Sequence, residues 1–478
     1  MEQIQCIVNF NDEVLVLDFF PCPALCCLRR AMLGGEVFRT LLSFLWSAFD
    51  GLPDIRRGKN TRYSMQDIAR SAFAVFFVQS PSFLAHQQLM QQAQGVNNGT
   101  TLFGIQRLPT DNQIRLLLDA ANPTLLRSVF ASVFEYLQQR EVLASFRSFA
   151  NTLLVALDGT GYFYSESIHC PSCTVAHHRD GRISYTHSAL MPAIVKPGCP
   201  QVIPLEPEFI VPQDGHEKQD CETAAAKRWL DSNAGGYSPL GITLLGDDIY
   251  ASQPFIQKVV EQELQYIFVA KPSSHKYLYE ELGASEKLGQ MKRLQRTHWT
   301  GKERRTLSYR YTNDIALKDS EDSIRVNWVE LTITNAEGKI LFRNSYVTSY
   351  LISDENVAEV VEAGRCRWKI ENENFNTLKT KGYHFEHNFG HGKQYLSQTL
   401  LSLNILAFLF HTVLELLDER CALLRKSLPR RDTFFQHIAA LTQYLCFASW
   451  QSLLWFMIRA LQEGPAPPPD PSVIIEEP

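Results

Sequence analysis

The chain has 478 residues and a formal net charge of −5, a length that predicts two or three domains with a sizeable core. The slightly acidic balance excludes a uniformly basic nucleic-acid coat, so any DNA contact must come from local patches. Eleven cysteines without a regular frame, and a start (MEQIQCIVNF) without the features of a signal peptide, favour a reducing, cytoplasmic compartment over a secreted disulfide scaffold.

Residues 1–145 are predicted to form a helical N-terminal region. Cys22 and Cys26 have the spacing of half a metal site, although buried, unpaired thiols are the commoner interpretation. Ser64 and Asp67 have near-capping-box spacing at a helix start. Further helices are expected after Thr110 and from Leu125 to Leu143, and basic residues cluster before the first helix: Arg56, Arg57, Lys59 and Arg62. Such helices suit a reader of DNA ends, and a plain helical bundle explains them equally well.

Residues 146–266 are predicted to be the first part of an α/β core. Asp158 ends the apolar run LLVALD and Asp247 follows ITLLGD, so each is a carboxylate at the end of a buried strand. Segments 152–166 and 183–196 read as an antiparallel pair of strands. A helix from 219 to 233 leads to the second acidic strand, and its first-turn acids, Asp220 and Glu222, are interpreted as capping residues. Asp248 is the rival of Asp247.

The segment IHCPSCTVAHHRDG between the paired strands contains candidate zinc ligands. Cys170 and Cys173 form a CxxC pair, the spacing of a zinc knuckle. Histidines that a closed hairpin could bring to them are His177, His178 and His187. A zinc site and a reduced, metal-free turn both remain open interpretations.

Residues 267–352 alternate polar and apolar side chains, which predicts a β-rich subdomain inserted between the second acidic strand and the next helix. Its first part contains eight lysines or arginines between Lys287 and Arg310 against one acid, Glu303. Basic and aromatic residues together can neutralise phosphates and stack on unpaired bases. The candidate DNA-binding residues here are Arg296, Trp299, Lys302, Arg304 and Arg305. The alternatives are a solvated edge hairpin and a Trp299 packed into the core of the subdomain.

Residues 353–462 are predicted to complete the core with a glutamate helix and C-terminal helices. Arg367 lies four residues before Glu371, where a guanidinium can hold a carboxylate in one orientation. The apolar runs in 400–417 and 437–461 are interrupted by polar residues, so core or subunit-contact helices are expected rather than membrane spans. The proline-rich tail, 463–478, is expected to be disordered.

Three segments carry a resemblance to a known family: LDGTGYFYS around Asp158, LGDDIYASQP around Asp247 and RWKIENENFNTLK around Glu371. They resemble DDE transposases of bacterial insertion sequences, in the branch with a β-rich insertion before the glutamate. The resemblance spans residues 150–393 and implies an RNase-H-like core with Asp247, rather than Asp248, as the second acid. The chain departs from the branch at Gly364, where a tyrosine is usual. It also has Leu378 where a lysine is usual, with Lys379 one place later.

The resemblance implies a DNA transposase that cleaves phosphodiester bonds at element ends and transfers the 3′-OH strands to target DNA. Asp158, Asp247 and Glu371 would hold two Mg²⁺ ions, or Mn²⁺, for two-metal catalysis. Additional DNA contacts would come from Arg367, Lys379 and Lys381. The implied partners are terminal inverted repeats, target DNA and a second copy of the chain on DNA, with no membrane and with a location at the bacterial nucleoid.

Three alternatives share parts of this pattern. An RNase-H-like nuclease without strand transfer would use the same acids. A non-catalytic, zinc-containing DNA-binding protein would use the CxxC pair and the basic segment, but it has no need for acids at strand ends, which repel phosphate unless a metal intervenes. A paired-carboxylate glycosidase would leave the basic, aromatic insertion without a role.

Overall fold

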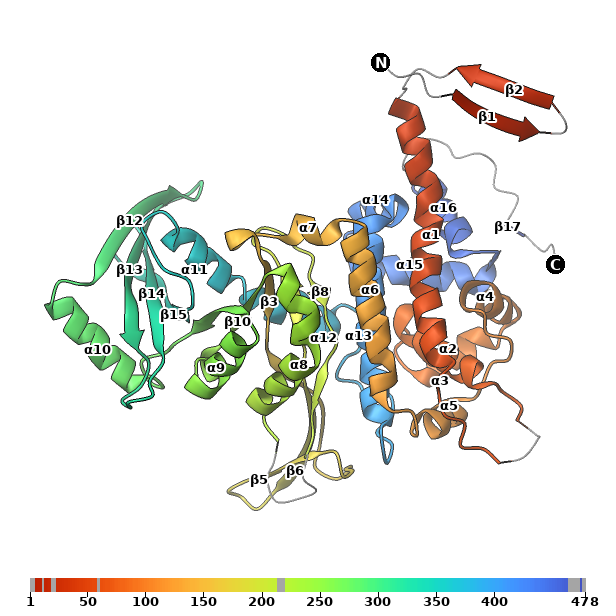
Figure 1. The fold of residues 1–478 in the computed structure, drawn as a ribbon. Coiled ribbons are helices and arrows are strands. Elements are labelled where there is room, and N and C mark those ends of the chain that lie inside the picture. The colour runs from red at the N-terminus through yellow and green to blue at the C-terminus, as the bar shows by residue number, and fades with distance from the viewer. Residues whose placement is uncertain are drawn as a thin grey trace.

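The computed structural model describes residues 5–10, 13–18, 23–57, 61–212, 220–462 and 473–474. Figure 1 shows a helical body on one side, an α/β core in the middle and a β-rich extension on the other side. The predicted class, an α/β protein with an inserted β-rich part and helical terminal regions, is confirmed. Several sequence interpretations concern residues or side chains outside the described part: Cys22, Cys26, Lys59 and most of the tail 463–478.

The helical body combines both ends of the chain. Helices α1 and α2 pack against α13, so apolar faces far apart in sequence share one core (Figure 1). The N-terminal helices are α1 (Pro23–Phe49), α2 (Met65–Phe77), α3 (Phe83–Met90), α4 (Ala93–Phe103), α5 (Asp111–Leu118), η1 (Pro123–Leu126), α6 (Arg127–Gln139) and α7 (Val142–Phe146). The C-terminal helices are α13 (Leu396–Leu417), α14 (Glu419–Ser427), α15 (Arg431–Tyr444) and α16 (Trp450–Ala460). Two short antiparallel pairs accompany them: β1 (Gln5–Phe10) with β2 (Glu13–Asp18), and β16 (Cys446–Phe447) with β17 (Val473–Ile474).

Local signals position several of these helices. Ser64 caps α2 by accepting a hydrogen bond from the Asp67 amide at 2.9 Å. The Asp67 carboxylate does not close a capping box, because it accepts from the Gln106 amide at 2.7 Å instead. The helix predicted from Leu125 to Leu143 is interrupted at Glu141, whose φ of 60° lies in the left-handed region, so α6 and α7 are separate.

Helix α13 is the one helix in the described residues that is long and apolar enough to cross a membrane. In the structure 83% of its most apolar window is buried inside the protein. The expectation of a core helix in this stretch is therefore confirmed.

A central nine-stranded sheet has the order β12-β13-β14-β15-β11-β10-β3-β7-β8. Strands β3, β10 and β11 are parallel, and β7 and β8 are antiparallel neighbours on the far side of β3. This arrangement of five strands is the RNase-H-like order. The five core strands are β3 (Leu153–Ala156), β7 (Ala193–Val195), β8 (Ile203–Pro204), β10 (Ile242–Gly246) and β11 (Gln265–Val269). The helical segments between them are η3 (Ser238–Leu240), η4 (Asp248–Tyr250), α8 (Glu222–Tyr237) and α9 (Gln253–Glu261), and η2 (Phe149–Asn151) precedes β3.

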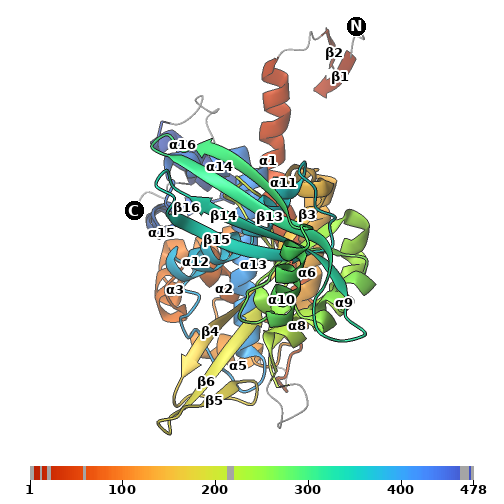
Figure 2. The same cartoon turned by 90° about the vertical axis from the view of Figure 1, so that its left-hand side faces the viewer.

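The two strands predicted at 152–166 and 183–196 each divide into two. Strands β3 and β7 pair in the central sheet, while β4 and β6 pair in a second sheet that projects from the core (Figure 2). The ribbon bends where the Met191 amide donates to the Asp158 carbonyl at 3.0 Å, next to Pro192, which has no amide hydrogen for the ladder. The second sheet contains β4 (Gly159–Ser165), β5 (Thr174–His177), β6 (Ile183–Leu190) and β9 (Glu208–Ile210).

The inserted module continues the central sheet instead of forming a separate body. Its last strand, β15, pairs antiparallel with core strand β11, for example Val347 with Phe268. The module contains α10 (Lys276–Lys287), β12 (Lys292–Trp299), β13 (Arg304–Ala316), β14 (Arg325–Thr334) and β15 (Ile340–Thr348). The chain then enters α11 (Val357–Arg365), the π-helix η5 (Ile370–Phe375) and α12 (Asn376–Thr380).

Candidate active site

Asp158 and Asp247 lie at the same edge of the central sheet. Strands β3 and β10 are parallel neighbours in which Leu154 pairs with Thr243 and Ala156 with Leu245. The same register, continued for two residues, sets Asp158 opposite Asp247. Because every residue of both strands is buried, the sheet presents these carboxylates from a rigid base.

Glu371 reaches this edge from the π-helix η5. Arg367 donates through Nη2 to Glu371 Oε1 at 2.6 Å and through Nη1 to Asp158 Oδ2 at 3.1 Å. The Arg367–Glu371 contact predicted from the sequence is therefore present. One guanidinium thus holds together two acids that are far apart in the sequence.

The acids at this edge influence one another. Burial raises the pKa of Asp158 to about 7; Arg367 opposes the shift, while Glu222, Glu371 and Asp247 reinforce it. A carboxyl that titrates near neutral pH, within a cluster of other carboxylates, is typical of a functional site rather than of a structural ion pair.

Glu222 is a fourth carboxylate of the cluster that the sequence interpretation missed. It lies in the first turn of α8, as expected for a capping residue, but its Oε1 accepts a hydrogen bond from the Tyr250 hydroxyl at 2.6 Å. Burial raises its pKa, and Asp247 adds to the shift. A Cβ on Gly159 would lie 2.4 Å from Glu222 Oε2, so only glycine allows this approach.

Two neighbouring aspartates point elsewhere. Asp248, the rival of Asp247, accepts a hydrogen bond from the Lys271 amide and lies 3.4 Å from His275 Nε2. Asp220 binds Arg228 at 2.7 Å. Neither contact involves the acid cluster, which favours Asp247 as the second acid of the site.

The departures from the family pattern have structural reasons. A Cβ on Gly364 would lie 2.9 Å from both Tyr346 and Ile267, so a side chain there has no room. Leu378 is fully buried and Lys379 pairs with Glu386 at 2.8 Å. A π-helix has more residues per turn than an α-helix, so η5 rotates the following residues by about one position. One extra residue in the π-helical turn would move a basic side chain from position 378 to position 379, where the chain has Lys379.

The candidate DNA-binding residues of the insertion lie at or near the hairpin of β12 and β13. Trp299 is 64% exposed, so the alternative that it packs into the core of the module is wrong. Lys302 and Arg304 are exposed beside it, whereas Arg305 pairs with Glu303 at 2.7 Å. Arg296 is exposed on β12, but alternation along the strand places it on the opposite face from Trp299. The exposed residue Lys381 lies just beyond α12.

The zinc candidates are only partly brought together. Cys170, Cys173 and His187 form one cluster with His391, a residue that the sequence interpretation missed. His177 is exposed, and His178 instead contacts Ser184 Oγ at 2.8 Å through Nε2. No local pattern could reveal His391, because it joins the cluster from a loop 218 residues beyond Cys173.

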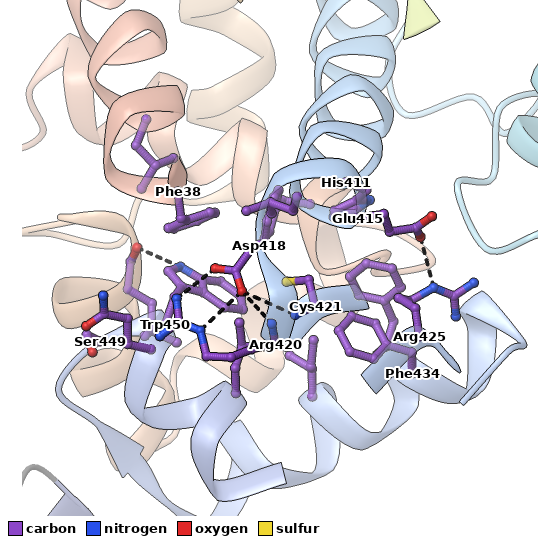
Figure 3. A pocket seen from close by; sticks show the side chains of 18 of the residues that line it. Phe38, His411, Glu415, Asp418, Arg420, Cys421, Arg425, Phe434, Ser449 and Trp450 are labelled. Carbon is purple, nitrogen blue, oxygen red and sulfur yellow. Dashed lines mark hydrogen bonds and ion pairs between the residues drawn. The ribbon is translucent and has the colours of Figure 1, made fainter. Parts of the chain in front are cut away.

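A cavity of about 190 Å³ lies in the helical body and not at the acids (Figure 3). Several charged groups in its lining are paired: Glu415 accepts from Arg425 at 2.9 Å, and Asp418 accepts from Arg420 at 2.7 Å. The first contact links α13 to α14, and the second lies at the start of α14, so both belong to the packing of the helical body.

The strand order and the acid cluster at the ends of β3 and β10 define the class of protein: an RNase-H-like fold with a carboxylate site at one edge of its sheet. Residues 211–409 match the family model of the transposase DDE domain, in agreement with the resemblance found in the sequence. The match contains Asp247 and Glu371, and Asp158 lies before it. A solved structure of the piggyBac transposase synaptic complex with hairpin DNA is similar, with 10% identity and a TM-score of 0.39, over 92% of this chain and 83% of that chain. No protein of curated function matches the sequence.

Proposed function

We propose that the chain is a DDE transposase that cleaves DNA at the ends of its element and transfers the 3′-OH strands to target DNA. The observation that carries the proposal is the convergence of Asp158, Asp247 and Glu371 at one sheet edge, beside Arg367. With Glu222 included, four carboxylates share one guanidinium, so the ionised cluster has excess negative charge. This excess fits the binding of a divalent cation.

The donor set fits Mg²⁺, or Mn²⁺, because carboxylate oxygens are the ligands that these hard ions prefer. Asp158, Asp247 and Glu371 would hold the metal. Bound metal would polarise the scissile phosphate and lower the pKa of the attacking water or hydroxyl. Arg367 keeps Asp158 and Glu371 close together in the metal-free protein, and it can turn to a phosphate oxygen when the acids bind metal.

DNA would reach the acids along the insertion and the segment after α12. Trp299, Lys302 and Arg304 lie together at one hairpin, where the ring can stack on a base and the cations can contact phosphates. Arg296, Arg305, Lys379 and Lys381 would add contacts to the DNA backbone. Because transposition joins two element ends, the active form would be a homodimer assembled on DNA.

A cleavage and strand-joining assay tests the proposal. The substrate is end-labelled DNA taken from the sequences that flank the reading frame, incubated with Mg²⁺ and an unrelated target duplex. We expect cleaved ends and joined products from the wild-type chain, and neither from Asp158→Asn, Asp247→Asn or Glu371→Gln. Asp248→Asn is the matched control, since Asp248 follows the same strand but points to Lys271 and His275. DNA binding by electrophoretic shift should persist in all four variants.

A nuclease without strand transfer is the second candidate, because the same acids support hydrolysis. Cleaved ends without joined products, at every target concentration, would favour the nuclease. Full cleavage by any one of the three acid variants would remove that residue from the proposed site.

A further inference from the structure

Four potential metal ligands from two distant segments meet beside the second sheet. Cys170 and Cys173 precede β5, His187 lies in β6, and His391 lies in the loop between α12 and α13. All four ligand atoms lie within 4.8 Å of one another. Cys173 and His187 are buried, and Cys170 and His391 are half-buried.

The distances in this cluster match a tetrahedral zinc site. Zn–S bonds are about 2.3 Å long and Zn–N bonds about 2.0–2.1 Å. In a tetrahedral site these lengths predict about 3.8 Å between two sulfur ligands and about 3.6 Å between a sulfur and a nitrogen ligand. The Cys170 and Cys173 sulfurs lie 3.9 Å apart. His187 Nε2 is 3.5 Å from each sulfur, and His391 Nε2 is 3.7 Å from Cys173 Sγ. The sulfurs are too far apart for a disulfide, whose S–S bond is about 2.05 Å.

Backbone hydrogen bonds hold the two cysteines together in the CxxC turn. The Cys170 amide donates to Cys173 Sγ at 3.4 Å, and the CxxC turn closes through the Cys173 amide and the Cys170 carbonyl at 3.1 Å. Two thiolates and two imidazoles form a neutral complex with Zn²⁺, the set found in structural zinc sites.

The loop that supplies His391 is itself firmly held. Asp119 accepts backbone hydrogen bonds from Lys393, Gln394 and Leu396 at 2.9–3.2 Å. Arg115 of α5 donates to the Phe389 carbonyl at 2.8 Å. His391 is therefore attached to the helical body on one side and faces the hairpin cysteines on the other.

We propose that Cys170, Cys173, His187 and His391 bind one Zn²⁺ ion, and that this zinc clamp fastens the β4–β6 hairpin to the segment that follows Glu371. Strand β4 begins at Gly159, one residue after Asp158, so the clamp joins the chain just beyond the first acid to the chain beyond the third. It closes a loop of 218 residues between Cys173 and His391. Cross-links over long loops remove much of the conformational freedom of the unfolded chain.

Metal content tests the ligand set without any reference to DNA cleavage. The full chain, purified without an affinity metal, should contain one equivalent of zinc by elemental analysis. Loss of an outer-shell partner lowers metal affinity by about 10–100-fold. Because each removes a direct ligand, we expect a larger loss of zinc affinity from Cys170→Ser, Cys173→Ser and His391→Asn. His177→Ala and Cys199→Ser are matched controls outside the cluster, and they should retain full zinc. Where a variant fails to fold, Co²⁺ substitution in the wild-type chain gives the tetrahedral thiolate absorption spectrum instead.

Hydrogen exchange tests the clamp. Chelation of zinc, or His391→Asn, should speed exchange of the β4 and β6 amides by at least about tenfold while the amides of β14 keep their rates. The ligand set is overturned if the wild-type protein contains no zinc. It is also overturned if the zinc content of His391→Asn equals that of the wild type. Full zinc with hairpin exchange unaffected by chelation overturns the clamp. Loss of strand joining with normal zinc content and normal hairpin exchange overturns neither the ligand set nor the clamp. It contradicts only the proposed transposase function, so the two failures can be told apart.

Discussion

Asp158 predicts an unusual response of stability to pH in the metal-free protein. Burial, together with Glu222, Glu371 and Asp247 and against Arg367, raises its pKa from 3.8 to about 7. Because the folded-state pKa lies above the unfolded-state value, the stabilising contribution of the protonated carboxyl is complete below about pH 4. It is lost as the pH rises through about 7. At about 1.4 kcal/mol per pKa unit, the loss approaches about 4 kcal/mol at pH 8.

Asp158→Asn removes this cost, because an amide stays neutral at every pH. In buffer without divalent metal, the free energy of unfolding from urea denaturation should be higher in the variant by up to about 4 kcal/mol at pH 8. The difference should be about 2–3 kcal/mol smaller at pH 5. Added Mg²⁺ should stabilise the wild type and not the variant, because ligands stabilise the state that binds them.

Asp319→Asn is the control for this measurement. Asp319 is exposed, so its replacement should change stability by less than about 0.5 kcal/mol at either pH. If Asp158→Asn is no more stable than the wild type at pH 8, and the difference does not vary with pH, the reasoning about this carboxylate is refuted.

Four further predictions concern aromatic and basic residues. Trp299→Ala should leave stability within about 0.5 kcal/mol and lower DNA-end cleavage by about 5–150-fold, the equivalent of about 1–3 kcal/mol of stacking; unchanged cleavage would end the stacking role. Trp328→Ala, at a residue only 1% exposed, should instead cost about 3–5 kcal/mol in urea denaturation. Arg367→Lys should slow single-turnover cleavage, because an ammonium cannot bridge two carboxylates as the guanidinium fork does; a wild-type rate would contradict this role. Tyr250→Phe removes the donor to Glu222 and should lower the free energy of unfolding by about 1–3 kcal/mol, and an unchanged value would mean that water replaces the hydroxyl.

The strand-end acids were predictable because their signal is local. Asp158 and Asp247 each follow a short apolar run, and parallel neighbours bring their carboxyl ends to one edge. The helical spacing of Arg367 and Glu371 likewise gives a contact that the structure contains. In these cases the residues that determine the geometry are adjacent in the sequence or belong to one repeating element.

Glu222 and His391 were not predictable for the opposite reason. Glu222 has the ordinary position of a first-turn acid, and only the fold brings Tyr250 and Gly159 to it. His391 belongs to a loop whose position depends on Asp119, far away in the helical body. The sequence also does not predict the bend between β3 and β4. A continuous run of strand-forming residues does not show where the chain passes from one sheet to another.

The continuity of the sheet into the insertion bears on any attempt to minimise the protein. Strand β15 covers the edge of β11, four of whose five residues are buried. Excision of the module would leave the amide and carbonyl groups of that apolar strand unpaired, a template for aggregation with other chains. In the intact protein the sheet instead ends at β12, whose Lys292, Arg293 and Arg296 are exposed. Charged side chains of this kind discourage edge-to-edge pairing, so β12 keeps neighbouring copies from joining into a common sheet.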